Sequence, residues 1–165
     1  MKSAVLLYNP QSGKGKIDIQ IEELCTVFRA YGYDIRPQEI DFNRNPFEGN
    51  ESVSLMVVAG GDGTLNFALN AMKRSGLDIP FGVIPAGTAN DFAGALGMSR
   101  KPLEAARQIA QGVEEQVDCG CVNGIYYVNV SRLGLCTTPS QRTPAHTQHP
   151  LGKPPPSRRR VNSRS

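Results

Sequence analysis

Short apolar runs alternate with segments of helical spacing along most of the chain. The apolar runs predict strands at 3–8, 34–40, 54–59 and 81–84. The intervening segments predict helices over 17–31, 64–73, 89–96 and 102–111. This alternation predicts an α/β fold, a Rossmann-like open parallel sheet with helices on both faces. The polar segment 41–52, rich in asparagine and glycine, predicts a loop.

A β-hairpin is predicted after the last helix. Residues 116–122 and 125–131 flank Asn123-Gly124, a dipeptide that favours a tight two-residue turn. A two-stranded ribbon is marginal in water, and an exposed apolar edge invites pairing between chains. We therefore expect a homodimer or aggregation through its apolar residues, which are Val117, Val122, Ile125, Tyr126, Tyr127, Val128 and Val130.

The composition changes after the hairpin. From Arg132 to Ser165 there are seven basic residues and no acidic one, whereas residues 1–131 hold 11 basic and 15 acidic residues, a net charge of −4. Six of the twelve prolines lie in this tail, three of them directly before Ser157 and Arg158-Arg159-Arg160. Such a segment cannot bury enough apolar surface to offset its ordering entropy. Residues 135–165 are therefore predicted to be disordered.

The remaining composition suits one domain in the cytoplasm. A chain of 165 residues with 39% hydrophobic residues can bury an ordinary core. No apolar run approaches the ~20 residues that span a bilayer, and no signal peptide is evident. We expect no nucleic-acid partner. Because their spacing does not suit a metal site, we expect reduced thiols without function at Cys25, Cys119, Cys121 and Cys136.

The glycine-rich loop after the strand at 54–59 predicts a phosphate-binding site. Gly60, Gly61 and Gly63 leave the backbone free to turn at positive φ and let its N–H groups approach a ligand. The loop ends at a helix start, which favours anions. The carboxylate of Asp62 would repel a phosphate unless a divalent cation lies between them. The alternative interpretation is a tight turn with an acidic tip.

A second loop of this kind follows the strand at 81–84. Gly87 and Thr88 precede another predicted helix start, with Asn90 and Asp91 in the first turn. Thr88 and Asn90 taken alone are typical helix caps. Two such loops at the carboxyl ends of parallel strands, however, predict the two walls of one ligand crevice.

Three stretches of sequence carry a resemblance to a known family: 8–16 (YNPQSGKGK), 60–66 (GGDGTLN) and 84–92 (IPAGTANDF). In this order and spacing they resemble the diacylglycerol kinase catalytic-domain family, in particular the bacterial soluble lipid kinases; sphingosine and ceramide kinases are more distant. The middle motif alone is shared with NAD kinases and, more loosely, phosphofructokinases. We place the likeness from about Ser3 to about Gly134.

The resemblance implies a transferase that moves the ATP γ-phosphoryl group to a lipid hydroxyl at the membrane surface, with Mg²⁺ and a diacylglycerol-like acceptor. It would be a peripheral enzyme of phospholipid biosynthesis. Asp62 and Asp91 would orient the metal, and Thr64 would also cap its helix. Lys14 either reaches a phosphate or lies in a solvated basic loop. The expected nucleotide-binding residues are Asn9, Lys14, Gly60, Gly61, Asp62, Gly63, Thr64, Asn66, Gly87 and Thr88.

The second half of the family pattern is not evident in the sequence. In the family, a hairpin at this point opens a β-sandwich that supplies part of the lipid cleft and the acidic general base, so the catalytic base here is unknown. We expect a nucleotide-binding domain at 1–115, the start of a truncated sandwich at 116–134 and the tail at 135–165. A frameshift explains such a tail, and a basic membrane anchor, worth about 1 kcal/mol per charge, is the alternative.

Two other functions remain open at this point. One is an NAD kinase-like enzyme, against which the segment from Gly87 to Asp91 speaks. The other is a non-catalytic nucleotide-binding fragment, which would bind ATP weakly and transfer nothing.

Overall fold

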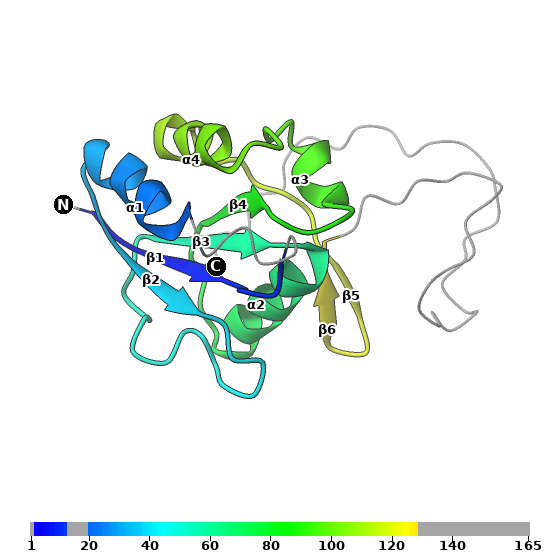
Figure 1. Ribbon diagram of the computed structural model, residues 1–165. Coiled ribbons are helices and arrows are strands. Elements are labelled where there is room, and N and C mark those ends of the chain that lie inside the picture. The colour runs from blue at the N-terminus through cyan, green and yellow to red at the C-terminus, as the bar shows by residue number, and fades with distance from the viewer. Residues whose placement is uncertain (1, 13–19, 129–165) are drawn as a thin grey trace, which may run out of the picture. The chain divides into compact units, whose positions relative to one another are not determined.

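The predicted α/β class is confirmed. The computed structural model describes residues 2–12 and 20–128, all within the compact unit Met1–Ser131. The strands and helices before the hairpin follow one another in the order β1 (Lys2–Tyr8), α1 (Ile21–Ala30), β2 (Tyr33–Glu39), β3 (Leu55–Gly60), α2 (Asp62–Arg74), β4 (Phe81–Pro85), α3 (Asp91–Ala95) and α4 (Pro102–Gln111), as Figure 1 shows. Residues 17–19 of the first predicted helix lie outside the described residues. No helix in the described part of the chain is long and apolar enough to cross a membrane.

The first four strands form one parallel sheet in the order β2-β1-β3-β4. The chain leaves β1 towards β2 on one side and returns as β3 on the other side. The loops that follow the neighbouring strands β1 and β3 therefore lead in opposite directions. The carboxyl ends of these two strands form the switch point at which open α/β sheets bind ligands. This topology places the segment after Tyr8 next to the segment after Gly60.

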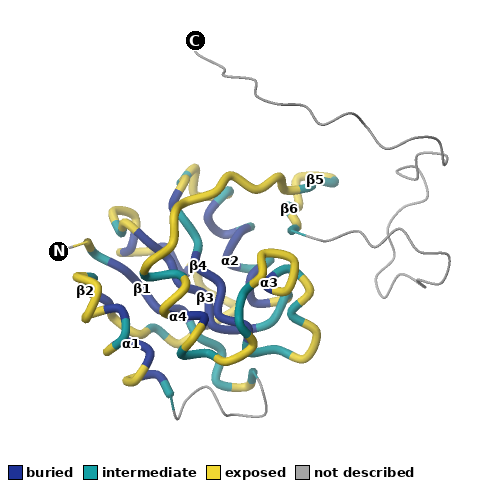
Figure 2. The backbone as a smooth tube through the Cα atoms, turned by 90° about the horizontal axis from the view of Figure 1, so that it is seen from above, coloured by how far each residue is buried: buried dark blue, intermediate teal, exposed yellow. Residues whose placement is uncertain are grey.

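Side chains that alternate along the strands form two cores, one on each face of the sheet. Ala4 and Leu6 pack in one cluster with α1 and α4, and Val5 and Leu7 pack in the other with α2. Every residue of β3 is buried, and Figure 2 shows the buried chain at the centre of the unit. Period-two alternation sends neighbouring residues to opposite faces, so a central strand covered on both faces is apolar throughout.

Cys25 belongs to the core under α1. Its side chain is fully buried, and that burial raises the pKa of the thiol above its ordinary value, while the nearby charge of Arg29 lowers it and that of Glu22 raises it. Cys119 and Cys121 are exposed free thiols. Cys136 lies outside the described residues.

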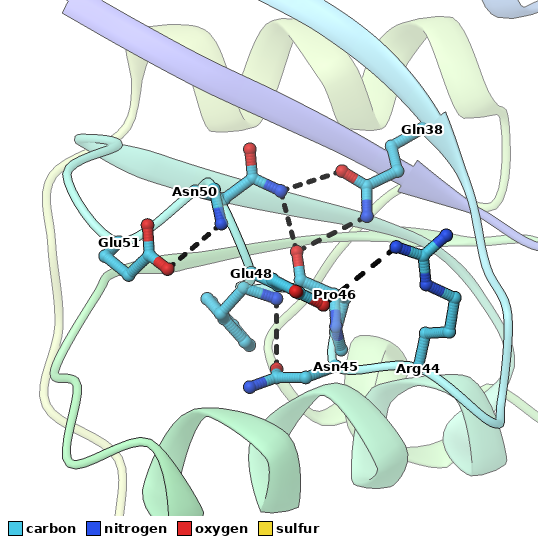
Figure 3. A network of polar contacts seen from close by, with 9 residues as sticks. Gln38, Arg44, Asn45, Pro46, Glu48, Asn50 and Glu51 are labelled. Atoms are coloured by element: carbon cyan, nitrogen blue, oxygen red, sulfur yellow. Dashed lines mark hydrogen bonds and ion pairs between the residues drawn. The ribbon is translucent and has the colours of Figure 1, made fainter.

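The loop between β2 and β3 is built around one buried amide, that of Asn50 (Figure 3). Its Nδ2 donates to the Gln38 Oε1 atom at 2.8 Å and to the Pro46 carbonyl at 2.7 Å, while Arg36 donates to its Oδ1. A buried amide with these partners avoids the cost of unpaired polar groups. The predicted loop is thus confirmed, with hydrogen-bonded turns in place of a helix.

The predicted hairpin is present but shorter than expected: β5 covers Gly120–Val122 and β6 covers Ile125–Tyr127. Asn123 and Gly124 both have positive φ, 52° and 77°, as a type I′ turn requires. The expected exposure of the hairpin's apolar residues holds only in part. Tyr126 and Val128 pack against the α2 core, whereas Val117, Ile125 and Tyr127 are exposed. Val130 lies outside the described residues.

Candidate functional site

The loops that carry the three motifs meet at the carboxyl ends of β1, β3 and β4. The N–H of Asn9 donates to the Ala59 carbonyl at 3.2 Å, and the N–H of Ala86 donates to the Gly60 carbonyl at 3.0 Å. These main-chain bonds hold the three loops side by side. The predicted crevice edge is therefore formed by segments more than 70 residues apart in the sequence.

The glycines of this site permit close contact between two loops. A Cβ on Gly87 would lie 2.5 Å from the Gly61 Cα, and a Cβ on Gly60 would lie 2.7 Å from Thr64. None of the glycines in these two loops adopts a left-handed φ. The prediction that they serve turns at positive φ is therefore wrong. Close approach of two main chains accounts for glycine at positions 61 and 87, and the Thr64 side chain accounts for it at position 60.

Asn90 is the N-cap residue of α3, and its side chain closes the second loop. It adopts a left-handed conformation, with φ 55° and ψ 42°, which asparagine tolerates better than most residues. The Gly87 N–H donates to its Oδ1 at 2.8 Å, and its Nδ2 donates to the Gly87 carbonyl at 2.7 Å. Asn90 thus occupies the cap position, but its side chain makes no capping bond, because both ends of its amide bond to Gly87.

The carboxylate of Asp62 joins the two loops. Its Oδ2 accepts from the N–H of Asp91 at 3.2 Å, and its Oδ1 accepts from the N–H of Phe92 at 3.3 Å. Asp62 thus pairs the first turn of α2 with the first turn of α3. Helix α2 begins at Asp62 with Gly61 as its N-cap, and Thr64 is buried inside the helix. The predicted capping role of Thr64 is therefore wrong.

This contact brings the carboxylate of Asp62, one predicted metal ligand, to the main-chain N–H of Asp91, the other. Mg²⁺ is usually held by one or two carboxylates together with phosphates and water. The Asp62 carboxylate, beside a helix N-terminus that can bind phosphate, fits such an ion. Across residues 2–12 and 20–128, no group of three or more acidic, histidine or cysteine side chains that could hold a metal ion is found.

The other predicted nucleotide-binding residues divide into three groups. Asn9 lies at the site, where its Oδ1 accepts from the Gln11 N–H at 3.0 Å, and Thr88 is exposed in the second loop. Asn66 bonds elsewhere: its Oδ1 accepts from the Val128 N–H at 3.1 Å. Lys14 lies outside the described residues.

Sequence reasoning missed Asn70, which bonds to the main chain of Tyr126. The signal that could have found it is its spacing. Asn66 and Asn70 follow Asp62 at intervals of four residues, so all three lie on one face of α2.

Comparison with known proteins gives the same relatives in sequence and in structure. Residues 3–122 match the family described as the diacylglycerol kinase catalytic domain. The chain is 32% identical over 159 residues to the diacylglycerol kinase of Bacillus subtilis (strain 168), covering 93% of this chain and 52% of that protein. It is 30% identical over 159 residues to one from Staphylococcus aureus (strain MRSA252), covering 92% and 50%. A solved diacylglycerol kinase from Bacillus anthracis superposes with a TM-score of 0.68 at 26% identity, covering 78% of this chain and 46% of that one.

The resemblance inferred from the three motifs is confirmed, but the position given for its end is wrong. A match that ended near Gly134 would cover only about four fifths of the chain, and the curated relatives match more than that. The chain spans about half the length of the curated relatives it matches. The domain boundaries expected at 115 and 134 stay predictions.

Proposed function

Because the chain belongs to the diacylglycerol kinase catalytic-domain family, we propose that it serves transfer of the ATP γ-phosphoryl group to the hydroxyl of a diacylglycerol-like lipid. The observation that carries the proposal is the junction of two glycine loops by Asp62 at the carboxyl ends of β3 and β4. In an open α/β sheet, this edge is where ligands bind.

The residues of this junction suit the phosphate end of a nucleotide. The main-chain N–H groups of Gly61 and Gly63, at the N-terminus of α2, would hold phosphate oxygens. Asn9, Thr88 and Lys14 would line the pocket around the nucleotide. Transfer of a phosphoryl group needs mainly positioning and neutralisation of charge, so a rigid loop pair is well suited to it.

Asp62 and Asp91 would hold Mg²⁺ beside these phosphates. When bound, the ion neutralises the negative charge of the phosphate oxygens during transfer. The Asp62 carboxylate would orient the ion and keep the second loop in place through its bonds to α3. This double role makes Asp62 the most informative residue to change.

The lipid end of the reaction is proposed from the family alone. The acceptor would bind at a membrane surface that the protein reaches from the cytoplasm, and the product would be a phosphatidic-acid-like lipid. Neither the acceptor pocket nor the general base is assigned to a residue of this chain.

Substitution of Asp62 tests the proposal. Asp62→Asn removes the charge but keeps the size of the side chain, and hydrogen bonds to a charged group contribute about 1.5–3 kcal/mol. We expect magnesium-dependent ATP binding, measured by calorimetry on the 165-residue chain, to weaken at least about tenfold. Asp78→Asn is the matched control, because Asp78 is exposed and forms a surface ion pair with Lys73.

Two outcomes would count against the proposal. Equal binding of ATP by the parent chain with and without magnesium would mean that no metal site exists. Binding of Mg-ATP by Asp62→Asn as tight as that of the parent would remove Asp62 from the site. Circular dichroism of both variants shows whether the fold is retained.

A further inference from the structure

Three polar side chains form a row along one face of α2: Asp62, Asn66 and Asn70. They are four residues apart, which places them above one another on the helix. Each bonds to the main chain of a segment that follows later in the sequence. Asp62 bonds to the start of α3, and the two asparagines bond to β6 and the residue after it.

The Asn70 amide pairs with Tyr126 as a neighbouring strand would. Its Nδ2 donates to the Tyr126 carbonyl at 2.6 Å, and its Oδ1 accepts from the Tyr126 N–H at 2.8 Å. One turn earlier on the helix, the Asn66 Oδ1 accepts from the N–H of Val128 at 3.1 Å. The side chains of Asn70 and Asn66 thus bond to main-chain groups of Tyr126 and Val128, on the edge of the hairpin that does not pair with β5.

The geometry of the hairpin explains why this edge is open to α2. With a two-residue turn, Val122 and Ile125 form the hydrogen-bonded pair next to the turn. The next pair, Cys121 and Tyr126, is therefore not hydrogen-bonded, and the main-chain groups of Tyr126 point away from β5. In Figure 1 the hairpin lies beside α2.

Apolar packing accompanies these bonds. Tyr126 and Val128 contact the core between α2 and the sheet, whereas Ile125 and Tyr127, which alternate with them, are exposed. The structure shows the hairpin docked on α2, with its edge bonded and two side chains packed. Release of the hairpin into water would break all of these contacts.

We propose that Asn66 and Asn70 are positioning residues, which dock the hairpin on the helix that begins at the glycine loop and so couple ligand binding at that loop to the docking of β6. The identity of the ligand, Mg-ATP, rests on the proposed function. α2 carries Asp62 at its start and both asparagines within the next two turns. A ligand that orders this helix start favours the docked hairpin, and by linkage a docked hairpin strengthens binding of that ligand.

The same substitution at the two asparagines tests the docking. An aspartate at position 66 still accepts from the Val128 N–H, whereas an aspartate at position 70 cannot donate and places its oxygen against the Tyr126 carbonyl. We expect Asn70→Asp to speed amide hydrogen exchange of Tyr126 and Val128 at least about tenfold. We expect Asn66→Asp, the matched control, to change it less than about threefold.

The amides of β1 and β3 report whether each variant is folded, because these strands are central in the sheet. If Asn70→Asp fails to fold, Asn70→Ser removes the same two contacts without adding a charge, and the same acceleration is expected. If the amide of Tyr126 exchanges at the same rate in the Asn66→Asp variant and in the variant at position 70, the proposed role of Asn70 in docking the hairpin is overturned.

The coupling is measured by adding Mg-ATP to the 165-residue chain. We expect it to slow exchange at Tyr126 and Val128 at least about threefold in the parent and in Asn66→Asp, but not in Asn70→Asp. Nucleotide binding without any change at β6 overturns the coupling while leaving the proposed function intact. If the parent binds no Mg-ATP, the coupling and the proposed function both fail, and docking is judged by the contrast between the two aspartate variants alone.

Discussion

At the scale of single residues, the site depends on how closely Gly61 and Gly87 pass each other. A Cβ on Gly87 would meet the main chain of Gly61, which cannot swing aside as a flexible side chain does. Gly63 lies only two residues after Gly61, in the first turn of α2, but a Cβ on Gly63 would meet no other atom within 4 Å. The same substitution at these two glycines should therefore have opposite effects.

We expect Gly87→Ala to lower the free energy of unfolding by about 1–3 kcal/mol, the usual cost of overpacking. Gly63→Ala should leave it unchanged or raise it by up to about 1 kcal/mol, because alanine is the better helix former. Denaturant unfolding of both variants measures the difference. Equal destabilisation by the two substitutions would mean that the loops do not touch at Gly61 and Gly87.

At the scale of elements, the sequence is informative wherever burial follows a local period. β3 is buried on both faces and stands out as an unbroken apolar run, and Asn123-Gly124 carries its own turn geometry. Contacts between distant segments leave no such local pattern. The Asn70 amide meets Tyr126 across 56 residues. The four-residue spacing of Asp62, Asn66 and Asn70 shows that they share one face of α2, but it does not show which segment they bond.

The site shows the same division. The three motifs and their approximate place at the sheet edge could be predicted, because parallel strands align their carboxyl ends. The roles of single side chains could not, because they depend on tertiary partners. Asn90 and Thr64 resemble helix caps in sequence, yet one bonds back to Gly87 and the other is buried within α2.

The hairpin also leads to a prediction about self-association. Ile125 remains 64% exposed and Tyr127 38% exposed in the described chain, and apolar residues on a short two-stranded ribbon favour pairing with a second ribbon. We expect concentration-dependent association of the parent in analytical ultracentrifugation and a clear reduction in Ile125→Lys. Val113→Lys is the control, since Val113 is 91% exposed but lies outside the hairpin. An equal effect of both lysines would point to net charge instead of the hairpin surface.

At the scale of the whole molecule, the described residues form only the phosphate end of the proposed site. They provide the sheet, the paired loops and the Asp62 carboxylate. The chain spans about half the length of its curated relatives. The origin of the basic segment 135–165 stays a prediction, and those residues lie outside the described part of the chain.

Binding and catalysis should therefore separate in this chain. We expect the purified 165-residue protein to bind Mg-ATP but to transfer no phosphate to diacylglycerol above background, because the family resemblance places the general base and part of the lipid cleft in a second domain. The measurement is transfer of labelled γ-phosphate to diacylglycerol in mixed micelles, with the Bacillus subtilis relative as positive control. Magnesium-dependent lipid phosphorylation by this chain would contradict the expectation. It would mean that a base lies within these 165 residues, and Asp91, which is exposed beside Asp62, would be the first residue to test.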